Sequence, residues 1–216
     1  VSNNTRTKAG KQTVTVSLKD KVNSEWADGS TDDVTFDFEI AKLSVEKPAK
    51  DSTDFVYNGK AQTYTVADSQ YYTVDGNVRT DAGKQTVTIA LKDTDNTEWK
   101  DGTVKEIAYD FEIAKLKVAK PTANTKSFVY NKQEQEYELA NSDYYEITNN
   151  KRTNAGYQMV KVALKDTANT EWKDGSQDAL SFKFEIGKAN PEVNVTMATD
   201  LVYNGSEQPL VTAGTT

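Results

Sequence analysis

The chain has 216 residues, of which 36% are hydrophobic, 27% charged and 10% aromatic, and its net charge at pH 7 is −7. The acidic balance argues against a nucleic-acid partner, which needs a basic surface, and against attraction to anionic lipid headgroups. The aromatic content argues against disorder, and the absence of His and Cys removes the commonest general base, the thiolate nucleophile and the usual zinc ligands. We therefore expect a folded protein that is not an enzyme, has no cofactor and does not insert into a membrane.

Short strands are predicted along the chain, and the stretch from Leu43 to Val118 illustrates their order. Apolar and polar residues alternate there with a period of two, which is typical of half-buried strands, and no stretch sustains a helical period. Asn58-Gly59 predicts a type I′ hairpin turn after the first of these strands. The expected strands, in chain order, are 55–57, 64–66, 72–74, 87–91, 109–113 and 116–118.

The sequence repeats itself every 73 residues. Trp26, Trp99 and Trp172 keep this spacing, as do the runs that begin at Phe38, Phe111 and Phe184. The low content of hydrophobic residues is consistent with small repeated units, because each small unit buries little apolar surface. We divide the chain into a C-terminal part of a repeat (1–42), complete repeats (43–115 and 116–188) and an N-terminal part of a divergent repeat (189–216). The period alone does not fix the phase of the folding unit.

Each repeat is expected to fold as a β-sandwich or a β-grasp-like unit, and the sequence does not choose between them. The junctions contain no Gly/Ser linker: Ile113-Ala114-Lys115 continues directly into Leu116-Lys117-Val118. The sequence therefore predicts an all-β tandem array of modules of about 73 residues that forms an elongated, semi-rigid rod.

Four recurring pieces carry a family resemblance: Tyr57–Gln62, Thr80–Ile89, Glu98–Gly102 and Phe111–Lys115. Together they resemble the tandem Ig-like or mostly-β-grasp repeats of large surface proteins of Gram-positive bacteria. The resemblance covers essentially the whole chain. It implies an extracellular, cell-wall-attached or secreted protein of adhesin type, and it implies no shared catalytic residue.

An acidic loop precedes each Trp. Asp93, Asn96, Glu98 and Asp101 recur in all three repeats, and their oxygen atoms are of the kind that calcium binds. The ordinary interpretation is a solvated loop in which Asp and Asn side chains close turns on their own backbone. We expect the ordinary interpretation and retain the four residues as weak calcium candidates.

Aromatic residues are the candidates for ligand binding. Trp99, with Tyr71 and Tyr72, could stack on a sugar ring, whereas the ordinary role of Trp is to fill a core. Arg79 precedes an Ala-Gly turn, and a structural salt bridge or a lock on this turn is its ordinary interpretation. A Lys–Asn isopeptide bond would suit a chain without disulfides, but alternation places Lys92 outward, opposite Leu91.

These observations predict a stalk or spacer at the cell surface or in the cell wall whose partners are the neighbouring repeats of the same chain. The alternative is a β-module that binds a host or matrix glycan or protein. A further possibility is association through unpaired strand edges at the incomplete end segments.

Overall fold

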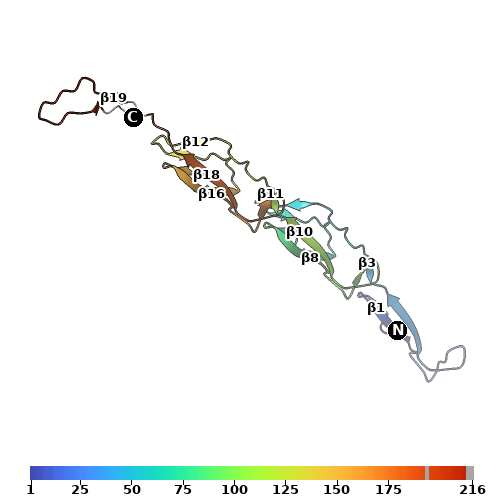
Figure 1. Cartoon of the computed structure of the whole chain (residues 1–216). Coiled ribbons are helices and arrows are strands. Elements are labelled where there is room, and N and C mark those ends of the chain that lie inside the picture. The colour runs from blue at the N-terminus through green and yellow to red at the C-terminus, as the bar shows by residue number, and fades with distance from the viewer. Residues whose placement is uncertain (193–194, 213–216) are drawn as a thin grey trace. The chain divides into compact units, whose positions relative to one another are not determined.

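The computed structural model describes residues 1–192 and 195–212. These residues form twenty strands joined by turns and bends, with no helix, so the predicted all-β class is confirmed (Figure 1). No described segment is a helix that could cross a membrane. The chain divides into two compact units, Val1–Leu116 and Lys117–Thr216.

The first unit contains one four-stranded sheet and three two-stranded pairs. The sheet has the order β4-β10-β8-β6, and the pairs are β1-β2, β3-β9 and β5-β7. The strands are β1 (Gly10–Val16), β2 (Val34–Ile40), β3 (Leu43–Val45), β4 (Phe55–Val56), β5 (Gln62–Thr63), β6 (Tyr72–Asp75), β7 (Val78–Arg79), β8 (Gly83–Leu91), β9 (Thr97–Trp99) and β10 (Ile107–Ala114).

The four-stranded sheet buries one of its two faces. β8 runs antiparallel to β10 and β6, whereas β4 runs parallel to β10. Val87, Ile89 and Leu91 are buried along β8, and Phe111 and Ile113 are buried along β10, while the residues between them are exposed or half-buried. The period of two that predicts these strands thus sorts their side chains into a core face and a solvent face.

Two neighbouring clusters form this core. Trp99 packs with Val45, Tyr72, Ile89 and Leu91. Phe111 packs in the other cluster with Tyr64, Val87 and Ile113. The pair β3-β9 and the segment from Phe55 to Tyr64 therefore supply the side chains that cover the buried face of the sheet.

The second unit, described by itself, repeats this arrangement. β11 to β18 each begin and end 73 residues after β3 to β10, and the sheet order β12-β18-β16-β14 matches β4-β10-β8-β6. Trp172, Phe184 and Val160 are fully buried. The strands are β11 (Leu116–Val118), β12 (Phe128–Val129), β13 (Gln135–Glu136), β14 (Tyr145–Thr148), β15 (Lys151–Arg152), β16 (Gly156–Leu164), β17 (Thr170–Trp172), β18 (Leu180–Gly187), β19 (Thr196–Met197) and β20 (Val211–Thr212).

Within the first unit, residues 1–42 and 43–115 are joined without a flexible linker. Only Ala41 and Lys42 separate β2 from β3. The Ala9 N–H donates to Oδ1 of Asn96 over 2.9 Å, and Nζ of Lys42 donates to the Thr94 carbonyl over 2.6 Å. The loop before β9 is thus hydrogen-bonded to the preceding segment.

The strand predictions need three corrections. Asn58-Gly59 does not form a type I′ hairpin, because only Gly59 of the pair has a positive φ (75°) and β4 and β5 belong to different sheets. Residues 64–66 are not a strand, although Tyr64 is buried. The short strands β5, β7 and β9 were not predicted, because two or three residues are too few to show a period.

Candidate binding groove

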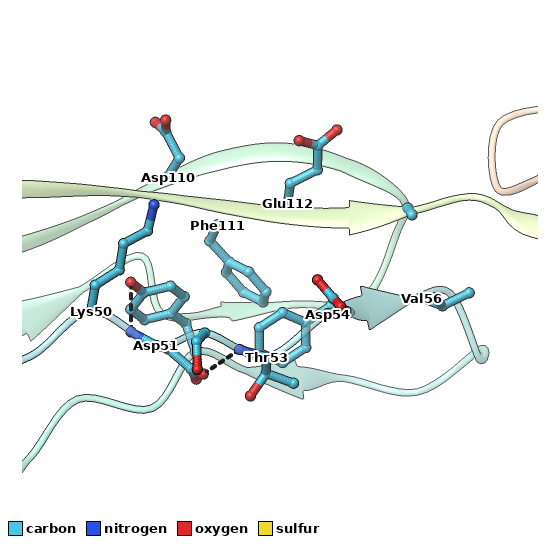
Figure 2. Close-up of a pocket in the computed structure, with 12 residues that line it drawn as sticks. Lys50, Asp51, Thr53, Asp54, Val56, Asp110, Phe111 and Glu112 are labelled. Atoms are coloured by element: carbon cyan, nitrogen blue, oxygen red, sulfur yellow. Dashed lines mark hydrogen bonds between the residues drawn. The ribbon is translucent and has the colours of Figure 1, made fainter.

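A groove of about 750 Å³ lies in the first unit between β10 and the loop that precedes β4 (Figure 2). β4 pairs only with Ile113 and Ala114 of β10, so the preceding part of β10 has no ladder partner on this side among the described residues. The loop 50–54 runs along that open edge. The groove is therefore a consequence of how short β4 is.

Asp51 holds the loop that forms one wall. Its N–H donates to the Tyr64 hydroxyl over 3.0 Å, and its carboxylate accepts from the N–H groups of Thr53 and Thr65 over 2.9 and 2.7 Å. The bonds from the Thr53 side chain and from the two N–H groups lower the pKa of Asp51 below its usual value. Burial raises the pKa of Tyr64. The loop is thus fixed to the core rather than free to move into the groove.

The groove has an aromatic floor and a charged rim. The Phe55 and Phe111 rings meet edge to face with centroids 4.9 Å apart. Asp110 and Glu112 lie on the opposite side of β10 from Phe111, and Lys50 extends toward Asp110 (Figure 2). With Asp51 and Asp54, the lining carries four carboxylates against one ammonium group.

The same place in the second unit has a different charge. The hollow there has about 330 Å³, and its lining includes Lys126, Lys183 and one carboxylate, Glu185. Asn124 replaces the loop-fixing aspartate and keeps its role, because its N–H donates to the Tyr137 hydroxyl over 3.0 Å and its Oδ1 accepts from the Lys126 N–H. The framework of the groove is preserved while its rim changes from acidic to basic.

The groove contains charged groups that can bind a ligand. Carboxylates and an ammonium group can pair with charged groups or form hydrogen bonds with hydroxyls, and the half-buried Phe55 ring can contact an apolar group. Among the described residues, no group of three or more His, Cys, Asp or Glu side chains is placed to hold a metal ion.

Three of the four calcium candidates, Asp93, Asn96 and Asp101, are engaged in hydrogen bonds or an ion pair. The Asp93 carboxylate accepts from the Asn96 side chain and backbone, which lowers the pKa of Asp93. Asp101 pairs with Lys47 and accepts from Thr103. Glu98 is half-buried on β9. Asp93 and Asp101 therefore close their own turns, as the ordinary interpretation predicts.

The structure places two of the three aromatic candidates in the core. Trp99 is 0% exposed and donates from Nε1 to the Lys105 carbonyl over 2.8 Å, and Tyr72 packs against it with ring centroids 5.8 Å apart. A ligand cannot reach the face of a fully buried indole, so Trp99 is not available for stacking on a sugar. Tyr71 alone of the three is exposed.

Of the two roles considered for Arg79, a salt bridge or a turn lock, the structure shows the turn lock. Its guanidinium donates to the carbonyl groups of Asp81 and Ala82 over 2.7 and 2.9 Å. Arg6 and Arg152 make the same pair of bonds at the equivalent turns. Lys92 is exposed, as alternation predicts.

Sequence reasoning missed the groove residues, Asp51, Asp54 and Asp110 among them. They lie in an irregular loop and on the solvent face of a strand, where no motif marks them. The sequence does contain one signal for them, a difference between the two repeats. Asp51, Asp54 and Asp110 are replaced by Asn124, Ser127 and Lys183 in the next repeat, while the core residues around them are kept.

Comparisons with known proteins do not assign the chain to a family. No protein-family model matches the sequence, and no curated protein matches it.

Proposed function

We propose that the chain is a tandem array of β-modules of about 73 residues that serves as a stalk or spacer in a bacterial cell-surface or secreted protein of adhesin type. The finer assignment to Ig-like or mostly-β-grasp repeats, and the location outside the cell or in the cell wall, rest on the sequence resemblance. The proposal includes that the modules are not enzymes.

The observation that carries this proposal is the repeated framework. The residues kept at the 73-residue spacing are those that fill the core or lock the backbone, such as Trp99 with Trp172 and Arg79 with Arg152. A stalk needs each module to fold in the same way and to be joined firmly to the next. The hydrogen bonds from Ala9 to Asn96 and from Lys42 to Thr94 provide such a joint within the first unit.

Small-angle X-ray scattering on the dilute monomer tests the proposal. Modules joined end to end give a rod-like scattering curve, to which each complete module contributes about 30–40 Å of length if it spans about ten residues of strand. A compact particle, or a curve typical of freely jointed beads, would contradict the stalk.

A second function is favoured by the groove. Its rim carries mainly carboxylates in the repeat 43–115 and mainly lysines in the repeat 116–188. Binding of different ligands by the two repeats would account for an unlike rim on a like framework. We propose a host or matrix glycan or protein as the ligand class.

Glycan arrays and NMR titration test this second function. A ligand of the acidic groove should shift the amides of residues 50–54 and 110–112, and Asp110→Lys, which introduces the lysine found at position 183, should weaken its binding. The matched control is Asp75→Lys, an exposed aspartate outside the groove lining. Binding that both variants weaken equally would indicate only general charge attraction.

A further inference from the structure

β10 has one edge that is open over most of its length. β4 pairs with β10 only at Ile113 and Ala114, and no other strand among the described residues pairs with β10 on this side. The Tyr57 N–H donates to the Ala114 carbonyl, so Ala114 turns its backbone groups toward this edge. Because backbone groups alternate between the two edges of a strand, Asp110 turns its own N–H and carbonyl groups the same way.

The pairing of β8 supports this orientation of Asp110. Asp110 lies opposite Thr86 in the antiparallel ladder of β8 and β10. A Cβ atom added at Gly76, which follows β6 on the other edge of β8, would collide with the Thr86 carbonyl oxygen. Thr86 therefore turns its carbonyl away from β10. Opposite residues of an antiparallel pair either bond to each other or both point away, so Asp110 points to the open edge.

The groove beside this edge is large enough for one extended chain. Its volume is about 750 Å³, and its lining includes residues 50–56 on one side and 110–112 on the other (Figure 2). The five residues 108–112 span roughly 17 Å, which matches a strand of four to six residues. Asp51 fixes the facing loop to the Tyr64 hydroxyl. Because the wall is preformed, little ordering of the protein is needed on binding.

The rim of the groove carries negative charge that is not compensated. Among the described residues, Asp54 and Asp110 make no side-chain hydrogen bond and no ion pair. Glu112 lies 3.5 Å from Lys84, and both side chains are mostly exposed, so this pair is weak. Lys50 is the one lysine among the described lining residues. The rim therefore favours a cationic ligand.

A strand added to this edge would send its side chains alternately to the two sides of β10. The residue opposite Asp110 would project to the solvent face, where Lys or Arg forms a favourable cross-strand pair with the carboxylate. The next residue would project to the side that carries Phe111 and the half-buried Phe55 ring, where an apolar side chain fits (Figure 2). Edge and rim together thus specify alternating basic and apolar residues.

The equivalent edge in the second unit has a different charge. β12 pairs with β18 only at Ile186 and Gly187, so the ladder is equally short. Lys183 replaces Asp110 there and pairs with Glu185, and the hollow has about 330 Å³. A basic ligand should therefore prefer the repeat 43–115, and the repeat 116–188 provides an internal control within the same chain.

We propose that the groove of the repeat 43–115 binds an extended segment of another protein in which basic and apolar residues alternate, and that this segment adds to β10 as a further strand. This inference rests on the groove being a binding site and specifies both its ligand and its mode of binding. Backbone hydrogen bonds to Asp110 supply affinity, and the rim carboxylates select positive charge. The same edge of a second copy is disfavoured, because it carries the same carboxylates.

NMR titration of the full chain with the capped peptide Lys-Val-Lys-Val-Lys-Val tests the proposal. The amides of residues 108–112 should shift. Hydrogen exchange of the Asp110 N–H should slow at least about tenfold at saturation, because this group joins a ladder. The N–H groups of Tyr109 and Phe111 face β8 and should exchange slowly with and without peptide. Slowing at Val74, on the opposite edge strand β6, in place of Asp110 would overturn the proposal.

Two further peptides separate the ladder from the charge. The same peptide N-methylated at every residue keeps its side chains but cannot donate to β10, and it should bind at least about tenfold more weakly. Glu-Val-Glu-Val-Glu-Val keeps the backbone and reverses the charge, and its affinity for this groove should fall by at least about the same factor. Undiminished binding of the N-methylated peptide would contradict strand addition.

Variants of the rim test the selection of charge. Asp54→Ser and Asp110→Lys introduce the residues found at positions 127 and 183, and each should weaken binding of the basic peptide, Asp110→Lys at least about fivefold. Both aspartates are exposed, so the variants should fold normally. Asp75→Lys makes the same charge change on the opposite edge strand and should have little effect. Equal weakening by Asp75→Lys would mean general charge attraction and would overturn the proposal.

The outcomes distinguish this inference from binding by the groove in general. A glycan that shifts the amides of residues 50–54 and 110–112 while exchange at Asp110 stays fast would leave the groove a binding site and overturn strand addition. Absence of binding by every peptide and glycan would overturn both. Slowing at Asp110 that rises with chain concentration in the absence of peptide would mean that a second copy occupies the edge, which also overturns the inference.

Discussion

Two kinds of residue recur at the 73-residue spacing: side chains that fill the core and side chains that lock the backbone. Trp99 represents the first kind, since its ring is fully buried and its Nε1–H reaches a carbonyl. Arg79 represents the second, because its guanidinium holds two carbonyl groups of the following turn. At the scale of the residue, these two side chains therefore serve folding.

Trp99→Ala should destabilise the first unit by about 3–5 kcal/mol, because it empties a fully packed site. Trp26→Ala should cost clearly less, since Trp26 is half-buried. Tyr71→Ala, an exposed site, should stay within about 0.5 kcal/mol of the wild type. Chemical denaturation followed by circular dichroism gives all three values. Equal losses of unfolding free energy in Trp99→Ala and Trp26→Ala would contradict the assignment of Trp99 to the core.

Stability should fall at acid pH through Asp101. The ammonium of Lys47, followed by the Thr103 hydroxyl and N–H, lowers the pKa of Asp101 from 3.8 to about 2. A carboxylate with a depressed folded-state pKa stabilises the fold above its unfolded pKa and loses that contribution as pH falls through the folded value. The loss should therefore occur between about pH 4 and pH 2.

Asp101→Asn is the variant that tests this pH dependence. Its midpoint of urea unfolding should fall less steeply than that of the wild type over the same pH range. Asp174 has its pKa lowered in the same way by Lys120 and Ser176, so the double variant with Asp174→Asn should flatten the profile further. An unchanged slope in both variants would show that other carboxylates govern acid unfolding.

At the scale of the element, turns decide how short strands are joined. Gly59 and Lys132 occupy equivalent places after β4 and β12, and both have positive φ, 75° and 66°. Glycine adopts this conformation without strain, whereas a residue with a Cβ atom is strained there. The Asx turns made by Asn58 and Asn131 are the same in both repeats. The turn therefore has the same conformation in both repeats, whether or not a glycine occupies the position with positive φ.

Reciprocal substitutions should move stability in opposite directions. Lys132→Gly should stabilise the second unit by about 0.5–1 kcal/mol, because it removes left-handed strain. Gly59→Lys should cost the first unit a similar amount, since an added Cβ meets no atom within 4 Å and only strain remains. Thermal unfolding of both variants provides the comparison. Destabilisation by Lys132→Gly would mean that the Lys side chain makes a contact worth more than the strain.

At the scale of the whole molecule, function depends on how segments are coupled. Within the first unit, the Asn96 side chain links the segment 1–42 to the repeat that follows by accepting from the Ala9 N–H, while the Asn96 carbonyl accepts from the Leu43 N–H inside that repeat. The same polar loop that suggests calcium binding thus acts as part of a joint. The proposed spacer function depends on such joints and not on a metal.

Asn96→Ala should loosen this joint without unfolding the repeat. Amide hydrogen exchange of β1 and β2 should become faster, because the segment loses a hydrogen bond to its neighbour, while exchange of β8 and β10 should remain slow. Asn58→Ala serves as the control in a loop that makes no such link. Unchanged exchange in β1 and β2 would show that Asn96 does not couple the segments.

The sequence by itself determined the all-β class, the 73-residue period and the identity of the core. Alternation along 87–91 and 109–113 is sufficient, because side chains of period two must separate into a buried and an exposed face. Composition excluded His- and Cys-based sites in the same direct way. The turn-locking role of Arg79 was also predictable, since it depends only on residues two and three positions away.

Only the tertiary structure decided which residues share a surface. The parallel pairing of Phe55 with Ile113 joins positions far apart in sequence, and it leaves open the edge of β10 where Asp51 and Asp110 form a groove. Packing against Tyr72 and the β3-β9 pairing bury Trp99, which sequence reasoning had offered as a residue for ligand stacking. Such juxtapositions follow from strand order and register, and a local period carries no information about which strand lies next to which.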